Sequence, residues 1–305
     1  MRALITGVSG FVGRHLEAHL RDAGDEVFGC DRADGSVDIG VLDSVRSTLE
    51  GVRPEVVYHL AGWSDVGGSW RAPVEVFRAN AEGTLNVLLA AAEYGVQRVV
   101  AVSSADVYGV VRETQLPITE DTPLRPVTPY AASKVAADYL ALQAWLGTRL
   151  PVLRVRAFNH LGPGQTPKFV APALADRIAR NEIDGGTTVP VGNLSARRDF
   201  TDVRDVVRAY RLLAEHGEPG EAYNVCSGID VSIQELADQL LAMARHPMKL
   251  EHDPDLERPV DVPVLRGDAA RLNAATGWTP TIPLAQTLTD LLDDLRARVS
   301  SDGVS

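Results

Sequence analysis

The sequence predicts an α/β protein with a doubly wound parallel sheet (Rossmann) and a smaller C-terminal lobe. Through the first half of the chain, near-continuous Val/Ile/Leu runs alternate with segments of helical periodicity. Such runs are typical of strands that are buried on both faces, and their alternation with helices indicates a parallel sheet covered by helices. After Phe158 the pattern changes to loops rich in glycine and proline, which predicts the second lobe.

The expected elements follow one another in order along the chain. Strands are predicted in the runs RALIT, EVFGC, VVYHL, RVVAVS and PVLRVRAF. Helices are predicted from Phe11, over 74–94, over 129–146, and near 169–181, 203–215, 232–244 and 284–298. We therefore expect residues 1–159 to form the Rossmann domain, with segments near 200–228 returning to it, and residues 160–305 to form mainly the second lobe.

Composition limits the classes of function. The 305 residues are 45% hydrophobic and 23% charged, which is ordinary for a globular protein with a full core. A net charge of −11 argues against nucleic acid or an anionic membrane as a partner, because both require a basic surface. No apolar stretch approaches the roughly 18 residues that span a bilayer, and the first strand begins without a leader-like segment. These features predict a cytoplasmic protein.

Cysteine usage points to a structural role. Cys30 and Cys226 are the only cysteines, and both lie in apolar runs. Two cysteines are too few for a disulfide framework or a cysteine-based metal cluster. We expect free, buried thiols and no metal site.

Three glycines between the first strand and the first helix suggest a diphosphate site. Gly7 would make the turn, Gly10 would let a phosphate approach the amides at the start of the helix, and Gly13 would let the helix lie close to the sheet. Phe11 and Val12 open that helix and belong to the same site. A tight turn alone would also use glycines, but the strand–turn–helix context favours a dinucleotide.

The end of the second strand bears on the choice of dinucleotide. Asp31 would accept hydrogen bonds from the 2′-hydroxyl of an adenosine ribose and repel a 2′-phosphate, which favours NAD(H). Arg32 could instead attract that phosphate, so NADP(H) remains possible, and Asp31 could also be an ordinary loop aspartate. Further residues are expected along the adenine and the pyrophosphate: Asp38, Ile39, Leu60, Ala61 and Gly62.

A candidate acid–base group follows in the next strand and helix. The strand RVVAVSS ends at Ser104, and the segment YAASK places Tyr130 and Lys134 on one face of a helix, where both can also reach the cofactor. A phenol has an ordinary pKa of about 10, and an adjacent ammonium and the nicotinamide charge would lower it. Ser104 would hold the substrate oxygen that Tyr130 protonates or deprotonates.

With these motifs the chain resembles the extended short-chain dehydrogenase/reductase family, and specifically its nucleotide-sugar-modifying members. The matching segments are TGVSGFVG, HLAG, SSADVYG, YAASK, FNHLGPGQ and RRDFTDVRD, in family order over essentially the whole chain. The resemblance implies that Ser104, Tyr130 and Lys134 are catalytic, and that the protein is a homodimer formed through the helices at 74–94 and 130–146. It also implies a set of residues that bind the nucleotide sugar: Ser64, Asn159, Lys168, Phe169, Val170, Asn193, Arg198 and Arg258.

Within this family, VGNLSARRDFTDVRD together with YNVCSG resembles the branch that acts on GDP-linked 6-deoxyhexoses. That resemblance implies NAD(P)H-dependent reduction of the C4 ketone of GDP-4-keto-6-deoxy-D-mannose to GDP-D-rhamnose. Many relatives that use uridine or thymidine sugars carry Gly-Asp-Gly where this chain has Gly192, Asn193 and Leu194. Asn193 either reads a base edge or shapes a turn.

The alternative within the family is a nucleotide-sugar 4-epimerase or 4,6-dehydratase with tightly bound NAD. Dehydratases of the family generally have an acidic residue two places after the catalytic serine and a polar acid just before it. Asp106 fills the first position, but Ala105 cannot protonate a leaving hydroxyl. Trp63 and Asp65 in the sugar-facing loop depart from the family pattern and leave the sugar open. The intact Ser-Tyr-Lys set argues against a cofactor-binding protein without catalysis.

Overall fold

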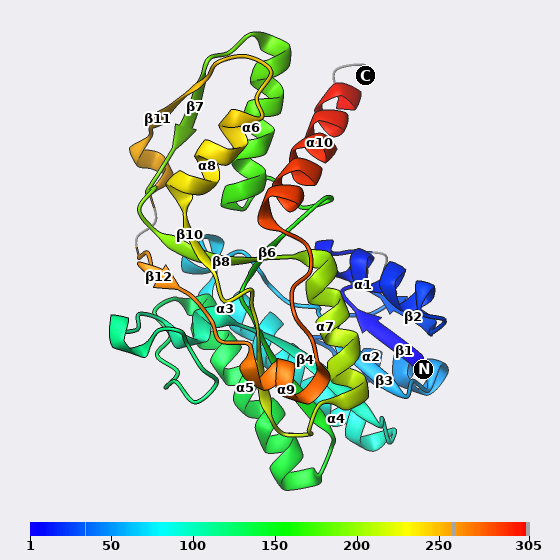
Figure 1. Ribbon diagram of the computed structural model, residues 1–305. Helices are drawn as coiled ribbons and strands as arrows, with labels where there is room; N and C mark the ends of the chain where they lie inside the picture. Colours follow the sequence, from blue (N-terminus) through cyan, green and yellow to red (C-terminus); the bar gives the residue numbers. More distant parts are fainter. Residues whose placement is uncertain (34, 258–259, 303–305) are drawn as a thin grey trace.

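The computed structural model describes residues 1–33, 35–257 and 260–302. Its centre is a six-stranded sheet in the order β2-β1-β3-β4-β5-β9, in which every neighbouring pair is parallel (Figure 1). The strands are β1 (Arg2–Thr6), β2 (Glu26–Cys30), β3 (Val56–His59), β4 (Arg98–Ser104), β5 (Val152–Ala157) and β9 (Ala222–Val225). The predicted doubly wound parallel sheet is confirmed.

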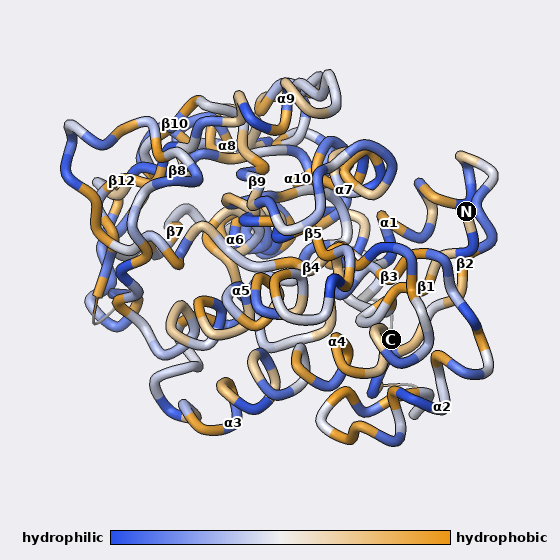
Figure 2. Tube along the Cα trace, turned by 90° about the horizontal axis from the view of Figure 1, so that it is seen from below, coloured by the Kyte–Doolittle hydropathy of each residue, from blue (hydrophilic) through white to orange (hydrophobic). Residues whose placement is uncertain are grey.

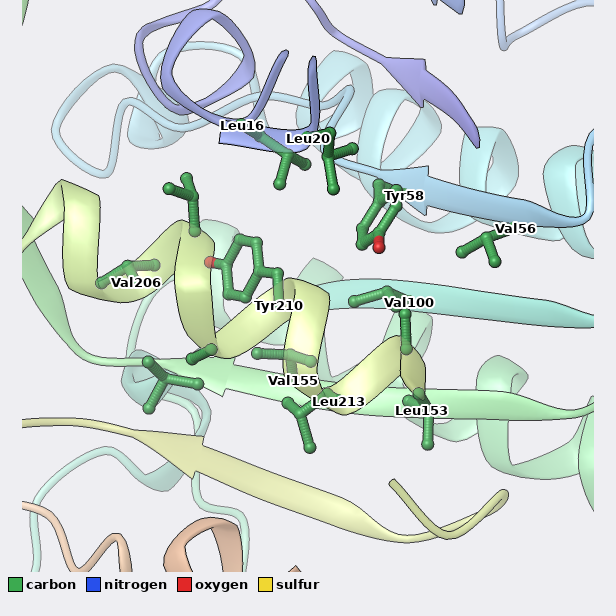
Figure 3. Close-up of a cluster of buried hydrophobic side chains, with 14 of the residues drawn as sticks. Leu16, Leu20, Val56, Tyr58, Val100, Leu153, Val155, Val206, Tyr210 and Leu213 are labelled. Atoms are coloured by element: carbon green, nitrogen blue, oxygen red, sulfur yellow. The ribbon is translucent and has the colours of Figure 1, made fainter. Parts of the chain in front are cut away.

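Helices cover both faces of this sheet. On one face lie α1 (Phe11–Asp22) and α7 (Val203–His216), and on the other lie α2 (Leu42–Val52), α4 (Gly83–Glu93) and α5 (Pro129–Thr148). Figure 2 places α4 and α5 on one side of β4 and β5, and α7 on the opposite side. Leu16, Tyr58, Val100 and Tyr210 belong to the core between the α1/α7 layer and the strands (Figure 3).

Three helical segments differ from the sequence prediction. The helix expected over 74–94 consists of α3 (Pro73–Phe77), a π-helical turn over Arg78–Glu82, and α4. No helix was predicted over 42–52, where α2 buries Val45 and Leu49 against the sheet. The short helix α9 (Ala270–Thr276) was also not predicted, and it buries only Leu272.

The rest of the chain forms a second core. One small sheet contains β10 (Asp230–Ser232), β8 (Arg197–Asp202) and β12 (Val264–Leu265), with β6 (Asn159–Leu161) also paired to β8, and another contains β11 (Lys249–His252) and β7 (Thr188–Val191). Helices α6 (Val170–Asp184), α8 (Ile233–Ala242) and α10 (Leu284–Asp302) pack there. Short 3-10 helices span Gly68–Trp70, Ala105–Tyr108, Glu113–Gln115 and Pro254–Leu256. The boundary at residue 159 stays a prediction.

Two further sequence features can be compared with the structure. Cys30 and Cys226 are buried, and neither thiol takes part in a disulfide, as expected. Among the helices of the described ranges, none combines the length and the hydrophobicity that crossing a bilayer requires.

Candidate functional site

A cavity of about 1150 Å³ lies at the carboxyl ends of the central strands. The strand ends contribute Gly7, Asp31, Leu60, Ser104 and Ala157 to its wall. Arg198 and Asp261, which lie outside the central sheet, close it from the other side. In doubly wound folds ligands bind at this edge, and a typical pocket for one small ligand measures about 300–1,000 Å³. The cavity therefore has room for more than one ligand.

The glycine turn leaves a bare backbone surface at one end of the cavity. Gly7 has a φ of +78°, which favours glycine, and a Cβ on Gly13 would lie 2.3 Å from the Gly7 carbonyl oxygen. Helix α1 starts at Gly10 with no side-chain cap, so its first amides are not satisfied by a capping side chain. Phe11 and Val12 line the cavity beside them. This geometry fits a diphosphate.

Asp31 lies at the end of β2, on the cavity wall together with Arg32. Its carboxylate accepts hydrogen bonds from the Ser9 hydroxyl at 2.5 Å, the Ser9 amide at 3.3 Å and the Ala33 amide at 3.0 Å. Ser9 was not singled out from the sequence, although it lies within the glycine turn. These contacts fix an acidic group where a ribose would bind.

The remaining predicted cofactor residues also line the cavity: Asp38, Ile39, Leu60, Ala61 and Gly62. Hydrogen bonds to β1 hold the loop after β3 in place. The Ala61 amide donates to Thr6 Oγ1 at 3.3 Å, and Thr6 Oγ1 lies 2.8 Å from His59 Nδ1. Burial, and then the charge of Lys134, lowers the pKa of His59 to about 3, so this imidazole is neutral. Thr6 and the neutral His59 thus hold, without adding charge, the loop at which the pyrophosphate is predicted to bind.

The predicted catalytic side chains of Ser104, Asp106, Tyr130 and Lys134 meet at the same cavity. Tyr130 is in the first turn of α5, which Thr128 caps by accepting a hydrogen bond from the Ala131 amide at 3.0 Å. Ser104 accepts from the Asp106 amide at 3.2 Å and starts the 3-10 turn over Ala105–Tyr108.

The two ionisable groups on α5 have shifted pKa values. Burial and the nearby Asp106 carboxylate raise the pKa of Tyr130, and a hydrogen bond with Ser104 opposes this. Burial lowers the pKa of Lys134 to about 8, and its ammonium donates to the Val102 carbonyl at 3.0 Å. In the protein without a dinucleotide, burial dominates and the tyrosine pKa is raised. That the ammonium and the nicotinamide charge together lower this pKa stays a prediction for the complex. Tyr130 stays protonated at neutral pH and can donate a proton.

Only some of the predicted substrate-binding residues lie at the cavity. Ser64, Asn159, Lys168, Phe169 and Arg198 line the cavity. Val170 starts α6 and is not among the cavity-lining residues, and neither is Asn193. Arg258 lies outside the described residues.

The Asn193 side chain shapes a turn, which is one of the two roles predicted for it. Its Oδ1 accepts from the Ser195 amide at 2.9 Å, and its Nδ2 donates to Asp261 at 2.9 Å. Asp261 also accepts from Arg198 at 2.5 Å. Asp261 was not predicted as a site residue, although it belongs to the sequence segment ERPVD that contains Arg258.

The loop after β3, which contains Trp63 and Asp65, is hydrogen-bonded to α5 through Asn80, which was also not predicted. Asn80 lies in the π-helical turn, accepts from the Trp63 amide at 2.7 Å and donates to Ser133 Oγ at 2.9 Å. Ser133 directly precedes Lys134 in α5. The Trp63 indole donates to the Asp65 carbonyl at 2.9 Å. π-helical turns occur frequently at functional sites, and this one links the two walls of the cavity.

The described ranges contain no group of three or more His, Cys, Asp or Glu side chains that could hold a metal ion. The fold and the cavity define a dinucleotide-binding protein with a Tyr–Lys pair beside a second ligand position. The chain belongs to the NAD dependent epimerase/dehydratase family, whose model matches residues 3–226.

Three relatives illustrate this membership. GDP-6-deoxy-D-mannose reductase of Pseudomonas aeruginosa is 39% identical over 99% of each chain. The structure of RMD from Pseudomonas aeruginosa complexed with NADPH superposes with a TM-score of 0.90, with 39% identity over 98% of this chain and 100% of that one. UDP-glucose 4-epimerase of Thermus thermophilus in complex with NAD gives a TM-score of 0.88 with 29% identity over 97% and 99% of the two chains.

Proposed function

We propose that this protein is an NAD(P)H-dependent reductase of a GDP-4-keto-6-deoxyhexose, converting GDP-4-keto-6-deoxy-D-mannose to GDP-D-rhamnose. The observation that carries the proposal is the set Ser104, Tyr130 and Lys134 on a cavity with room for two ligands, with Ala105 where a dehydratase needs an acid. The name of the Pseudomonas aeruginosa relative at 39% identity supports the GDP-sugar class.

The chain's own groups would divide the work of reduction. The bound dinucleotide supplies the hydride. Tyr130 delivers the proton to the ketone oxygen, and burial, together with the adjacent carboxylate of Asp106, raises the tyrosine pKa and keeps the phenol protonated until then. Ser104 holds the ketone oxygen in place, and the Lys134 ammonium stabilises the phenolate that remains.

The deciding experiment measures cofactor stoichiometry. A reductase releases its oxidised cofactor in every cycle, so GDP-4-keto-6-deoxy-D-mannose with NADH or NADPH should give one product per reduced nicotinamide consumed, followed by absorbance. GDP-mannose alone should give no 4-keto product.

The alternative, a 4-epimerase or 4,6-dehydratase with tightly bound NAD, is favoured by Asp106 alone, which could remove a proton from carbon. Hydride delivery to a ready-made ketone needs no carbon base, so Asp106→Asn should impair reduction only modestly. Turnover of a nucleotide sugar without added reductant, abolished by Asp106→Asn, would overturn the reductase proposal in favour of this alternative.

The base specificity gives a prediction about ligand-induced stability. GDP should raise the melting temperature more than UDP or dTDP at equal concentration, because stabilisation follows affinity. Arg198→Ala should remove most of the shift with all three, since the diphosphate is common to them. Arg180→Ala, which changes an exposed arginine on α6, is the control and should keep the shift. An equal or larger shift with UDP would contradict the guanosine assignment.

For the cofactor we propose a preference for NADH over NADPH, supported by the Asp31 carboxylate at the ribose position. Replacing it (Asp31→Ala) removes the acceptor for the 2′-hydroxyl and the repulsion of a 2′-phosphate. We expect NADH affinity to fall by about tenfold, the value of one hydrogen bond to a charged group, and NADPH affinity to rise. Fluorescence titration measures both. Asp43→Ala, which changes an exposed side chain on α2, should change neither affinity, and a parent protein that binds NADPH more tightly would refute the preference.

We also propose a homodimer formed through α3, α4 and α5. These helices expose large apolar side chains: Val74, Phe77, Leu89, Tyr139 and Leu146. Light scattering at micromolar concentration should give twice the chain mass of 32.8 kDa, and Leu146→Arg should give a monomer. Ile183→Arg, at an isoleucine of similar exposure on α6, should remain dimeric. A monomeric parent protein would contradict the proposal.

A further inference from the structure

Trp63 is a partly exposed tryptophan that lines the large cavity. It lies in the loop after β3, and the other tryptophans of the chain, Trp70, Trp145 and Trp278, are not among the cavity-lining residues. The indole N–H is the only hydrogen-bonding group of this side chain, and it donates to the Asp65 carbonyl at 2.9 Å. Trp63 therefore presents an apolar ring at the cavity, and the single donor of that ring is already bonded.

Hydrogen bonds attach the backbone of Trp63 to the start of α5. The Asn80 side chain accepts from the Trp63 amide at 2.7 Å and donates to the Trp63 carbonyl at 3.2 Å. It also donates to Ser133 Oγ at 2.9 Å, and this hydroxyl donates to the Tyr130 carbonyl at 2.6 Å. Because Asn80 and Ser133 are both buried, water does not compete for these bonds. The position of Trp63 is thus fixed relative to the turn of α5 that carries Tyr130.

The cavity wall contains further apolar groups from the segments that carry the catalytic side chains. A Cβ on Gly62, the residue before Trp63, would lie 3.8 Å from Lys134 Nζ, so the loop enters the cavity beside the catalytic lysine. Ala105, in the 3-10 turn after β4, and Val127, shortly before α5, line the same cavity. None of the three side chains, those of Trp63, Ala105 and Val127, has a hydrogen-bonding group to spare for a ligand.

The part of the sugar that reaches this end of the cavity follows from the reaction. Reduction at C4 requires the C4 oxygen to lie at Tyr130. C5 is bonded to C4 and carries C6, so C6 is two bonds from the reacting carbon. C1 lies across the ring and carries the diphosphate, for which Arg198 is the predicted partner. The C6 group is therefore held at the Tyr130 end of the cavity, to which Trp63 is attached.

We propose that the Trp63 ring packs against the C6 methyl group of the sugar and thereby selects a 6-deoxyhexose over the same sugar with a hydroxyl at C6. This inference rests on the proposed function, since it takes a GDP-4-keto-6-deoxyhexose as the substrate. A methyl group against the ring leaves no polar group unpaired, whereas a C6 hydroxyl there would lose its water without gaining a hydrogen bond. Trp63 is thus a specificity-determining residue that takes no part in the proton transfer.

The test uses GDP-D-rhamnose and GDP-D-mannose, which differ only by the hydroxyl at C6, together with GDP. Calorimetric titration with no dinucleotide added keeps both sugars from reacting. The parent protein should bind GDP-D-rhamnose about ten- to a hundredfold more tightly than GDP-D-mannose, the range in which an apolar site rejects an added hydroxyl.

Two variants of Trp63 and one control complete the test. Trp63→Ala, which lets water reach the C6 hydroxyl, should reduce the preference to about threefold or less and leave GDP affinity unchanged. Trp63→Gln, which places a hydrogen-bonding amide there, should reduce it as well. Trp70→Ala changes an exposed tryptophan that is not among the cavity-lining residues, and it should bind all three ligands like the parent. Melting curves of the ligand-free variants check that each one folds.

Several outcomes would overturn the inference. Equal affinity of the parent for the two sugars would mean that C6 is not read, and tighter binding of GDP-D-mannose would mean that a polar group bonds the C6 hydroxyl. An unchanged preference in the folded Trp63 variants, or an equal loss in Trp70→Ala, would refute the role of Trp63. These outcomes leave the proposed function standing, because consumption of the reduced cofactor tests it separately. If the parent bound neither GDP nor either sugar, the proposed function would fail as well.

Discussion

Tyr130→Phe is expected to lower the turnover number by about 10²–10⁴, the usual contribution of general acid catalysis. The phenol reaches the cavity from the first turn of α5, and its raised pKa keeps the proton that the ketone oxygen must receive. The ring itself remains, so dinucleotide binding should be nearly unchanged. Steady-state rates together with a binding titration measure the two effects separately.

Two further variants are compared with Tyr130→Phe. Tyr94→Phe changes an exposed tyrosine that follows α4 and is not among the cavity-lining residues, and it should keep full activity. Lys134→Ala should weaken both turnover and cofactor binding, because the ammonium serves both. Near-parental activity in Tyr130→Phe would refute the catalytic assignment of Ser104, Tyr130 and Lys134.

Asp138→Ala should lower the free energy of unfolding by about 3–5 kcal/mol, the usual result of removing one partner from a buried ion pair. The Asp138 carboxylate on α5 is 0% exposed and bonds Arg154 at 2.8 Å and Arg156 at 2.9 Å, both on β5. Arg156 also donates to the hydroxyl of Tyr108, which lies in the 3-10 turn after β4. Without Asp138 two guanidinium groups lose their buried counter-charge.

Urea unfolding measures this loss, and a surface pair provides the control. Asp293 on α10 is 63% exposed and pairs with Arg296 one turn later, so Asp293→Ala should change the free energy of unfolding by no more than about 1 kcal/mol. If Asp138→Ala cost no more than Asp293→Ala, the Asp138 cluster would not be the attachment of α5 to the sheet that its burial indicates.

The sequence predicted those parts of the site that depend on local pattern. The strand ends, the glycine turn and the spacing of Tyr130 and Lys134 all lie within short segments, and neighbouring parallel strands bring such segments to one edge. Contacts between distant segments carry no such signal. Asp261 meets Arg198 across 63 positions, and this pairing depends on how the second core packs.

The pKa of Tyr130 could not be predicted from the local sequence either. The sequence places a lysine one turn away, but whether burial or the ammonium dominates depends on what covers the phenol. Covering groups come from several elements, among them the 3-10 turn that holds Asp106. Tyr210 was not predicted as a cavity residue because its helical position is that of an ordinary core residue.

The strand order has a consequence for recombination between relatives. Strand β9 completes the central sheet beside β5, and α7 covers one of its faces, yet both come from beyond residue 200. A chimera of two relatives joined once near residue 159 would take β9 and α7, which belong to the central sheet and its covering layer, from the second parent. To exchange nucleotide specificity, the segments of the second core before α7 and after β9 must therefore be replaced separately. Helix α7 and strand β9 should come from the same parent as the first 159 residues.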